Sequence, residues 1–242
     1  MTGAFFIPGV QRSGSHYLEN VSVRLIPLFP LPLVLFPRAP LPLHIFEPRY
    51  RQMLADCMSG DRKFGIICRD EGVGEREIVP GTVGCVAHIE TAQQLPDGRS
   101  NILVQGGERF TLERFVADAA PYHVAEIATI GDRAEPWNLL GPLSEQLRTL
   151  FERVGRSART IADDAAPLPD LPDDPAHVSF AIAQYIDLDL AVKQRLLTSR
   201  SPSERLRELS DLLTSIVGSV ELRAETHVRA RGNGHGPAPE AP

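Results

Sequence analysis

Apolar residues in the first half of the chain recur mostly at alternate positions, which is the spacing of β-strands. The segments with this spacing are 23–29, 41–46, 63–69, 83–95, 100–105, 108–116 and 122–130. One helical repeat interrupts them, at Tyr50, Met53, Leu54, Cys57 and Met58, after a proline that suits a first turn, Pro48. We therefore expect six or seven short strands around one short helix, as in a small closed or half-closed β-barrel.

Helical spacing replaces strand spacing after 132–136. Four helices are predicted around Leu143–Val154, Val178–Ile186, Val192–Leu197 and Leu206–Val220, the last opened by a capping sequence at 201–204. The stretch 163–174 holds five aspartates and three prolines, so we expect a loop there. The predicted fold class is α+β, with a leader at 1–21, a β-barrel at 22–131, a C-terminal helical bundle at 132–223 and a disordered tail at 224–242.

Acidic side chains outnumber basic ones in both predicted parts of the chain. The net charge is −6, and residues 22–131 hold 11 basic and 13 acidic side chains while residues 132–223 hold 11 and 15. The basic surface of a typical nucleic-acid binder is therefore absent from the composition. The longest apolar run, Leu25–Phe46, contains six prolines, which excludes a membrane-spanning helix. Three scattered cysteines without a CxxC pair predict a reducing, cytoplasmic location and no structural zinc.

Motifs for catalysis are missing from the sequence. Its only lysines, Lys63 and Lys193, do not follow a glycine, so no nucleotide-binding GxxxxGK[ST] loop is present. Both lie among polar neighbours, which argues against a Ser–Lys dyad with a desolvated lysine. HExxH and GxSxG are absent too. We therefore expect a protein that is not an enzyme and that uses no cofactor and no metal.

The segment Glu47–Arg51 is the most distinctive polar cluster, with two arginines beside a glutamate. One interpretation makes these arginines a carboxylate-binding site. The other, which we favour, is a helix start whose arginines pair with local acids. His44 interrupts an apolar run but has no partner that is visible in the sequence.

The segments 24–54 and 81–115 together resemble the opening of the Lon N-terminal domain family, the substrate-binding domain of ATP-dependent Lon proteases. The similarity includes the proline-studded start, the helix after the Phe-Glu-Pro-Arg-Tyr segment and a Gly-x-x-Arg-Phe step at Gly106–Phe110. Residues 171–213 are similar to the bundle that follows the barrel in these proteins. The resemblance implies a PUA-like β-barrel followed by a helical bundle, and the chain contains no counterpart of the family's ATPase or peptidase modules.

The leading hypothesis for function is a non-catalytic module that binds unfolded or extended polypeptides or a protein partner, as an adaptor or chaperone-like protein. PUA-like barrels also occur in RNA-modifying proteins, so RNA binding is the alternative, although the acidic balance argues against it. An enzyme with an unrecognised site and a structural partner subunit are the remaining hypotheses. The sequence leaves the oligomeric state open.

If the chain binds polypeptides, the predicted contact is the apolar segment 35–43. Both alternating sets of side chains are apolar there, so one set needs cover from the helical bundle or stays open for a partner. The residues predicted to form this site are Phe36, Pro37, Leu41, Pro42 and Leu43.

Overall fold

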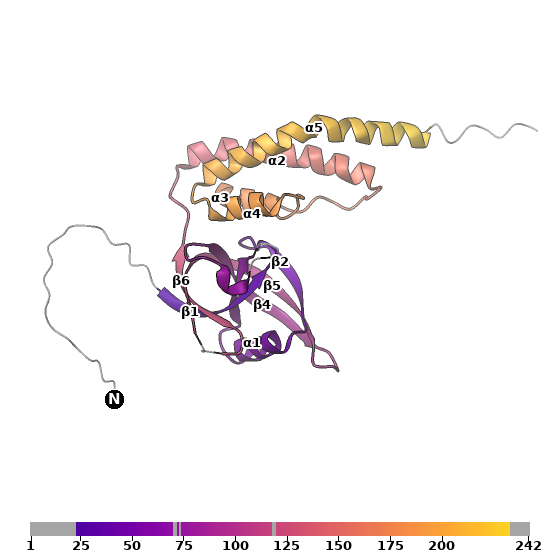
Figure 1. The fold of residues 1–242 in the computed structure, drawn as a ribbon. Helices are drawn as coiled ribbons and strands as arrows, with labels where there is room; N and C mark the ends of the chain where they lie inside the picture. The colour runs from indigo at the N-terminus through magenta and orange to yellow at the C-terminus, as the bar shows by residue number, and fades with distance from the viewer. Residues whose placement is uncertain (1–22, 70–71, 73, 118–119, 233–242) are drawn as a thin grey trace, which may run out of the picture.

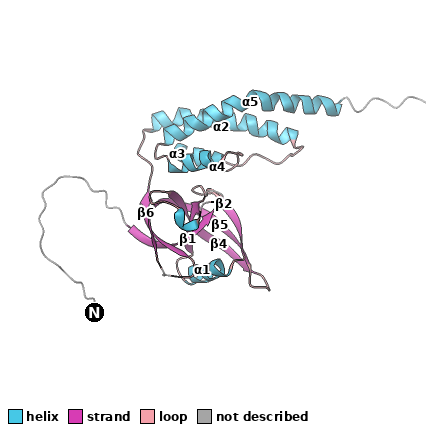
Figure 2. Ribbon diagram, viewed as in Figure 1, coloured by secondary structure: helices cyan, strands magenta, loops and turns pink. Residues whose placement is uncertain are grey.

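A computed structural model describes residues 23–69, 72, 74–117 and 120–232, and these form an α+β fold with the strands in one lobe and most helices in another (Figures 1 and 2). The strands are β1 (Val23–Leu31), β2 (Pro40–Ile45), β3 (Lys63–Cys68), β4 (Val83–Gln94), β5 (Ser100–Val116) and β6 (His123–Ile130). The helices are α1 (Pro48–Ser59), α2 (Trp137–Ile161), α3 (Pro175–Ala183), α4 (Leu190–Thr198) and α5 (Pro202–Gly232), with a short 3-10 helix, η1 (Glu75–Glu77). We call the described residues from 23 to 130 the sheet lobe and those from 137 to 232 the helical lobe. The predicted leader, 1–21, lies outside the described residues.

The sheet is mixed, with the strand order β2-β5-β4-β3-β1-β6. β1 and β3 are parallel, and the other neighbours are antiparallel. β6 pairs with β5 as well as with β1, so the pairings of β5, β4, β3, β1 and β6 run in a circuit, while β2 continues the sheet from β5. The number of strands agrees with the prediction.

The short helix forms where helical spacing interrupts the strands. Pro48 occupies its first turn, where the missing N–H costs nothing. Tyr50, Met53, Leu54 and Cys57 are buried on one face, as their spacing predicts. Gly60 follows the last turn and donates its N–H to the carbonyl of Cys57. The predicted α1 is therefore confirmed.

The two strands predicted at 100–105 and 108–116 are one continuous strand, β5, so this part of the prediction is wrong. We interpreted Gly106-Gly107 as a break, but Gly106 serves close packing. A Cβ at this position would overlap the carbonyl oxygen of Phe36. Two main-chain bonds, from Arg38 N–H to Gly106 and from Gly106 N–H to Ala39, join β5 to the segment before β2.

The hairpin between β4 and β5 turns where the sequence predicts it, at Pro96-Asp97-Gly98. Leu95 accepts the N–H of Gly98 and donates its own N–H to Arg99. Gly98 has a φ of 80°, a left-handed conformation that glycine adopts without a steric penalty. The distal half of the hairpin projects from the lobe beside α1 (Figure 1).

In the helical lobe, α2 and α5 run alongside each other, and α3 and α4 lie between them and the sheet (Figure 1). The segment 163–174 is a loop, as predicted. The predicted tail is wrong for residues 224–232, because α5 continues to Gly232. Its last turns are held by partners distant in sequence: Arg153 pairs with Glu221, and Asp163 pairs with His227 and Arg231.

One apolar cluster runs through both lobes without a break. It joins side chains of α1 and the sheet, such as Met53 and Ile66, to side chains of the helices, such as Phe180 and Leu209. A second cluster, around Phe110 and Ile127, belongs to the strands. Among the described residues, no helix is long and apolar enough to cross a bilayer.

The packing at Gly106 predicts that a Gly106→Ala variant is destabilised, because the added methyl group would displace the backbone at Phe36. We expect a loss of about 1–3 kcal/mol in the free energy of unfolding, measured by urea denaturation. The control is Gly218→Ala in α5, where a Cβ has open space. This change should be neutral or stabilise by up to about 1 kcal/mol. Equal effects of the two changes would contradict the packing described here.

Candidate functional site

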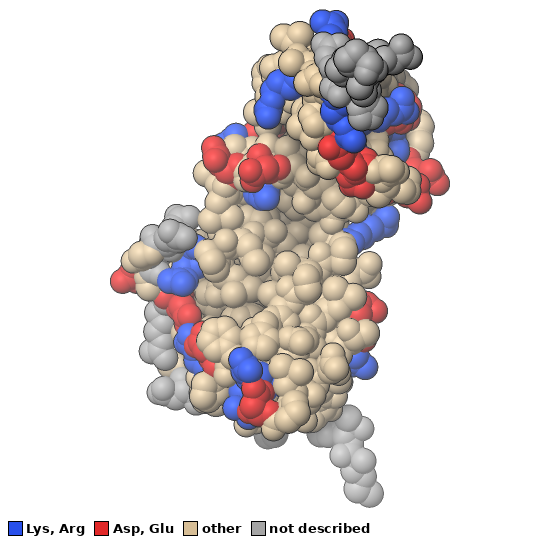
Figure 3. Space-filling view, turned by 90° about the vertical axis from the view of Figure 1, so that its right-hand side faces the viewer, with Lys and Arg blue, Asp and Glu red and all other residues tan. Residues whose placement is uncertain are grey.

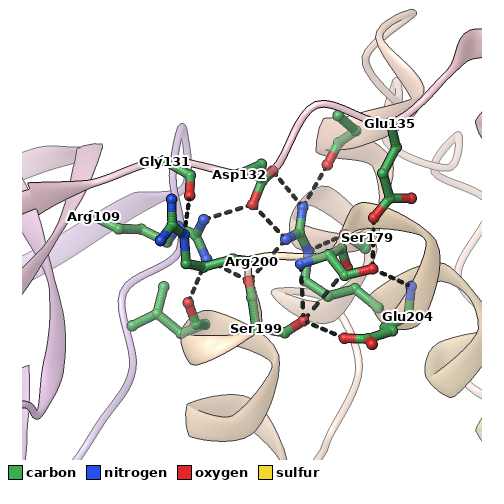
Figure 4. A network of polar contacts seen from close by, with 12 residues as sticks. Arg109, Gly131, Asp132, Glu135, Ser179, Ser199, Arg200 and Glu204 are labelled. Atoms are coloured by element: carbon green, nitrogen blue, oxygen red, sulfur yellow. Dashed lines mark hydrogen bonds and ion pairs between the residues drawn. The ribbon is translucent and has the colours of Figure 1, made fainter. Parts of the chain in front are cut away.

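A buried polar network connects the sheet lobe to the helical lobe (Figure 4). The carboxylate of Asp132 accepts hydrogen bonds from Arg109 of β5, at 2.6 Å, and from Arg205 of α5, at 2.7 and 2.8 Å. Both guanidinium groups are almost completely buried. Burial lowers the pKa of Arg109, and the facing carboxylate opposes this effect. Main-chain carbonyls accept further hydrogen bonds, from Arg109 at Leu197 and Ser199 and from Arg205 at Ala176 and Ser199, and the Ser179 hydroxyl accepts one from Nε of Arg205.

The linker between the lobes is tied to the start of α5. Arg200 donates from Nε to the carbonyl of Gly131, and the N–H of Arg133 donates to the carbonyl of Arg200. Glu135 accepts hydrogen bonds from the Ser201 hydroxyl at 2.6 Å and the Ser203 N–H at 3.1 Å. Burial alone would raise the pKa of Glu135, but these hydrogen bonds lower it below its ordinary value. The linker thus belongs to the contact between the lobes. We call this contact, made by the Asp132 network, the linker and the start of α5, the joint.

Phe36, one of the residues predicted to form the polypeptide contact, is buried where the two lobes meet. Its side chain is 2% exposed and stacks on Phe180 of α3, with ring centroids 5.7 Å apart. Arg205 lies over the same Phe180 ring, 4.1 Å from its centroid. Of the two alternatives for the segment 35–43, cover by the helical bundle therefore applies to Phe36, which is not exposed to a partner.

The other predicted residues lie at or near the surface of β2 or just before it. Leu41 and Leu43 are half-buried and face the core, Pro37 is half-buried, and Pro42 is exposed. Pro42 is paired across the sheet with Leu103 of β5.

The exposed side chains around Pro42 form what we call the outward patch, made of Pro40, Pro42, Phe46 and Leu103. Phe46 is 58% exposed and Leu103 is 38% exposed. Figure 3 shows the side of the molecule on which β2 and β5 lie: charged side chains gather toward its two ends, and a broad uncharged band lies between them. An exposed apolar patch of this kind is typical of a site for a protein or peptide.

A cleft of about 870 Å³ lies between the lobes at a different place. Ile78 and Val79 line it from the sheet lobe, and Arg133, Arg195 and Arg200 line it from the linker and the helical lobe. The Arg195 guanidinium pairs with Glu208, whereas that of Arg133 forms no hydrogen bond or ion pair with any described residue. The cleft could hold a ligand with apolar and anionic parts.

Pairing with local acids, the interpretation that we favoured for the Glu47–Arg51 cluster, is confirmed for Arg49. This side chain donates to both carboxylate oxygens of Glu75, at 2.6 and 2.8 Å, and to Glu47 at 3.0 Å. His123 lies 2.7 Å from the same Glu75 carboxylate. Burial alone would raise the pKa of Glu75, but the hydrogen bonds from Arg49 and His123 outweigh it and lower the pKa.

Neither lysine forms a hydrogen bond with a serine in the part of the chain that the structure describes. Lys63 begins β3 and Lys193 lies in α4, and both are half-buried. Within the same residues, no three His, Cys, Asp or Glu side chains are grouped so that they could hold a metal ion.

The substrate-binding domain of the ATP-dependent protease La (LON) is the family whose model matches this chain, over residues 25–215. The chain belongs to this family. Lon protease 2 of Herpetosiphon aurantiacus is 30% identical over 207 residues, which are 84% of this chain and 25% of that protein. The Lon protease of Xanthomonas oryzae is 27% identical over 234 residues, which are 94% of this chain and 27% of that protein. The chain thus matches about a quarter of the length of these Lon proteases.

Two solved structures of Lon N-terminal domains superpose on this chain. A Lon N-terminal domain protein from Xanthomonas campestris superposes with a TM-score of 0.54 at 28% identity, covering 77% of this chain and 96% of that one. The N-terminal domain of the Mycobacterium avium complex Lon protease superposes with a TM-score of 0.59 at 18% identity, covering 79% and 98%. The second likeness shows a shared fold.

Sequence reasoning missed the joint, although one signal for it was present. The Gly-x-x-Arg-Phe step that resembles the LON family contains both Gly106 and Arg109. In this structure Gly106 permits the close approach of β5 to Phe36, and Arg109 reaches Asp132. An arginine in an alternating strand is normally interpreted as a solvent-facing residue, so its burial was not expected.

Removing the carboxylate at the joint should be strongly destabilising. In an Asp132→Ala variant the buried guanidinium groups of Arg109 and Arg205 lose their only counter-ion among the described residues. We expect the free energy of unfolding to fall by about 3–5 kcal/mol. Asp170→Ala is the matched control, since Asp170 is exposed and forms no hydrogen bond or ion pair with the described residues. Its effect should stay within about 0.5 kcal/mol, and a similarly small effect at Asp132 would contradict a stabilising joint.

The Glu75 cluster predicts a loss of stability in acid. The pKa of Glu75 in the folded protein lies below its ordinary 4.5, so its stabilising contribution is complete above that pH. This contribution is lost as the pH falls through the lower, folded-state pKa. Unfolding free energies measured from pH 7 to pH 3 should therefore fall less steeply for Glu75→Gln than for the wild type. Glu113→Gln, at an exposed position, should keep the wild-type slope. Identical slopes for all three proteins would refute the role of Glu75.

Proposed function

We propose that this protein is a polypeptide-binding module that recognises unfolded or extended segments on its outward patch. The observation that carries the proposal is the exposed apolar patch on β2 and β5, on the side with a broad uncharged band of a domain whose family is named for substrate binding in LON proteases (Figure 3). Pro42 lies within the patch, and Pro37, Leu41 and Leu43 flank it. Phe36 is excluded because α3 covers it.

The patch has the physical properties that binding of an unfolded chain requires. Phe46 and Leu103 expose apolar surface, and covering such surface is favourable by about 25 cal/mol per Å². An unfolded protein offers apolar side chains that a folded protein buries, so it gains more from the patch than a folded protein does. The uncharged surroundings impose no particular charge pattern on the ligand, which fits a broad range of sequences.

No observation favours RNA as the ligand. Phosphate contacts from lysine and arginine supply most of the affinity of proteins for nucleic acids. On the side of the molecule shown in Figure 3 such residues lie mostly toward the two ends, with few in the band between them, and the chain as a whole has a net charge of −6.

The proposed role is that of a non-catalytic adaptor or chaperone-like protein in the cytoplasm. The family match covers a substrate-binding domain, which supports a protein that presents polypeptides without cleaving them. We also propose that the circuit of strand pairings in the sheet lobe is a small PUA-like barrel, with β2 as its added outer strand.

Polar substitution of the patch should remove binding without unfolding the protein. The test variant is Phe46→Ser with Leu103→Ser, measured by fluorescence anisotropy with labelled, reduced and carboxymethylated lactalbumin as the unfolded probe. We expect an unchanged melting temperature and a Kd at least about tenfold weaker, from the loss of two apolar contacts. The control is Leu222→Ser with Val228→Ser, two exposed apolar positions on α5. Equal binding by the two double variants would remove the outward patch from consideration.

A further inference from the structure

Two stretches of strand beside the first residues of β5 have an outer edge that pairs with no other described strand. One is β2, which pairs with β5 alone. The other is the distal half of β4: β3 pairs with β4 up to His88, three more hydrogen bonds join Arg62 to Ile89 and Glu90, and Thr91–Gln94 pair with β5 alone. An open edge offers main-chain donors and acceptors to another extended chain. The two edges differ in what they offer.

The register of the hairpin determines which groups of β4 point outward. Leu95 donates its N–H to Arg99, so the pair Leu95–Arg99 is hydrogen-bonded. Hydrogen-bonded and non-bonded pairs alternate along antiparallel strands, which makes the pairs of Ala92 and Gln94 with β5 non-bonded. The N–H and C=O groups of Ala92 and Gln94 therefore point away from β5, toward the open edge. Each of these two residues offers one donor and one acceptor.

The edge of β2 is poor in donors. Ser100 and Ile102 of β5 turn their main-chain groups away from β4 and toward Ile45 and Leu43 of β2. By the same alternation, the residues of β2 with outward groups are Pro40, Pro42 and His44. Prolines have no N–H, so His44 supplies the single outward donor of this edge. β2 is thus protected against strand addition, and distal β4 is not.

A groove of about 610 Å³ lies beside the distal β4 edge, between the hairpin and α1. Ala92 and Gln94 line one wall, and Ala55 and Met58 of α1 line the other, with Met58 40% exposed. Neighbouring side chains on one face of a sheet lie next to each other. Alternate side chains of a strand added to β4 would therefore project into this groove.

Arg51 lines the same groove near the hairpin turn, with its guanidinium next to Gly98. Unlike Arg49, it forms no side-chain hydrogen bond or ion pair with the described residues. An unpaired guanidinium of this kind can donate hydrogen bonds to the carboxylate of a ligand.

We propose that the distal edge of β4 binds an extended polypeptide segment as an added strand. Ala92 and Gln94 form the main-chain hydrogen bonds, alternate side chains enter the groove beside α1, and Arg51 pairs with a carboxylate of the segment. This mode of binding rests on the proposed function and specifies how the polypeptide is held. It also explains sequence-tolerant recognition, because main-chain hydrogen bonds are common to all sequences.

The test removes one outward donor from each edge. Ala92→Pro deletes the outward N–H of β4, and His44→Pro deletes the outward N–H of β2, both at positions where the strand pairing loses no hydrogen bond. His44 also stacks on Phe46 and contacts Asn101, so His44→Ala, which removes these contacts and keeps the N–H, is the reference for this edge. With labelled, reduced and carboxymethylated lactalbumin, we expect Ala92→Pro to weaken the Kd at least about tenfold and His44→Pro to bind as His44→Ala does. Unchanged binding by Ala92→Pro, or equal weakening by both proline variants, overturns strand addition at β4 while leaving the proposed function in place. A wild-type protein that does not bind the probe defeats both proposals.

A second measurement leaves the protein unchanged, in case Ala92→Pro does not fold. The probe is a fluorescein-labelled peptide of alternating threonine and valine that ends in aspartate, with N-methyl groups on either the odd or the even residues. An added strand uses alternate N–H groups, so one N-methylated series should lose binding at least about tenfold and the other should retain it. Equal binding, or equal loss, in the two series contradicts strand addition.

Discussion

The carboxylate of Asp132 lies between the guanidinium groups of Arg109 and Arg205, and the arrangement of the two lobes depends on this contact (Figure 4). Two buried cations would repel each other strongly in a medium of low dielectric constant. One carboxylate, four main-chain carbonyl hydrogen bonds and the Phe180 ring surround them instead. Because these groups come from β5, the linker and the helical lobe, the network can form only when both lobes are in place.

The joint also determines which apolar side chains of the sheet lobe are exposed to a ligand. The helical lobe covers Phe36 and leaves the outward patch on β2 and β5 open. β5 is the strand that links these regions, since Arg109 anchors its middle at the joint while its first residues pair with β2 and with distal β4. β5 therefore connects the patch, which it contacts through Leu103 and its pairing with β2, to the β4 edge. A bound segment could pair with the edge and also cover exposed side chains on the sheet.

Local signals in the sequence predict most of the fold and little of the joint. Pro48 and Gly60 bound α1, and the turn at 96–98 and the loop at 163–174 lie where proline, glycine and aspartate predict them. The end of α5 escaped prediction because its support comes from Arg153 and Asp163, which lie more than sixty positions away in the sequence. The polypeptide site stays a prediction, and whether the helical bundle or solvent faces Phe36 depends on long-range packing that the alternation of apolar residues in 35–43 does not encode.

Hydrogen exchange tests the central claim, that extended polypeptides pair with the distal edge of β4, most directly. The outward amides of Ala92 and Gln94 have no partner in the described sheet, so they should exchange rapidly in the free protein. Adding reduced and carboxymethylated lactalbumin in excess should slow exchange in the segment 90–95, with little change in β2. Unchanged exchange at 90–95, with protection confined to the cleft between the lobes or to β2, would contradict the account.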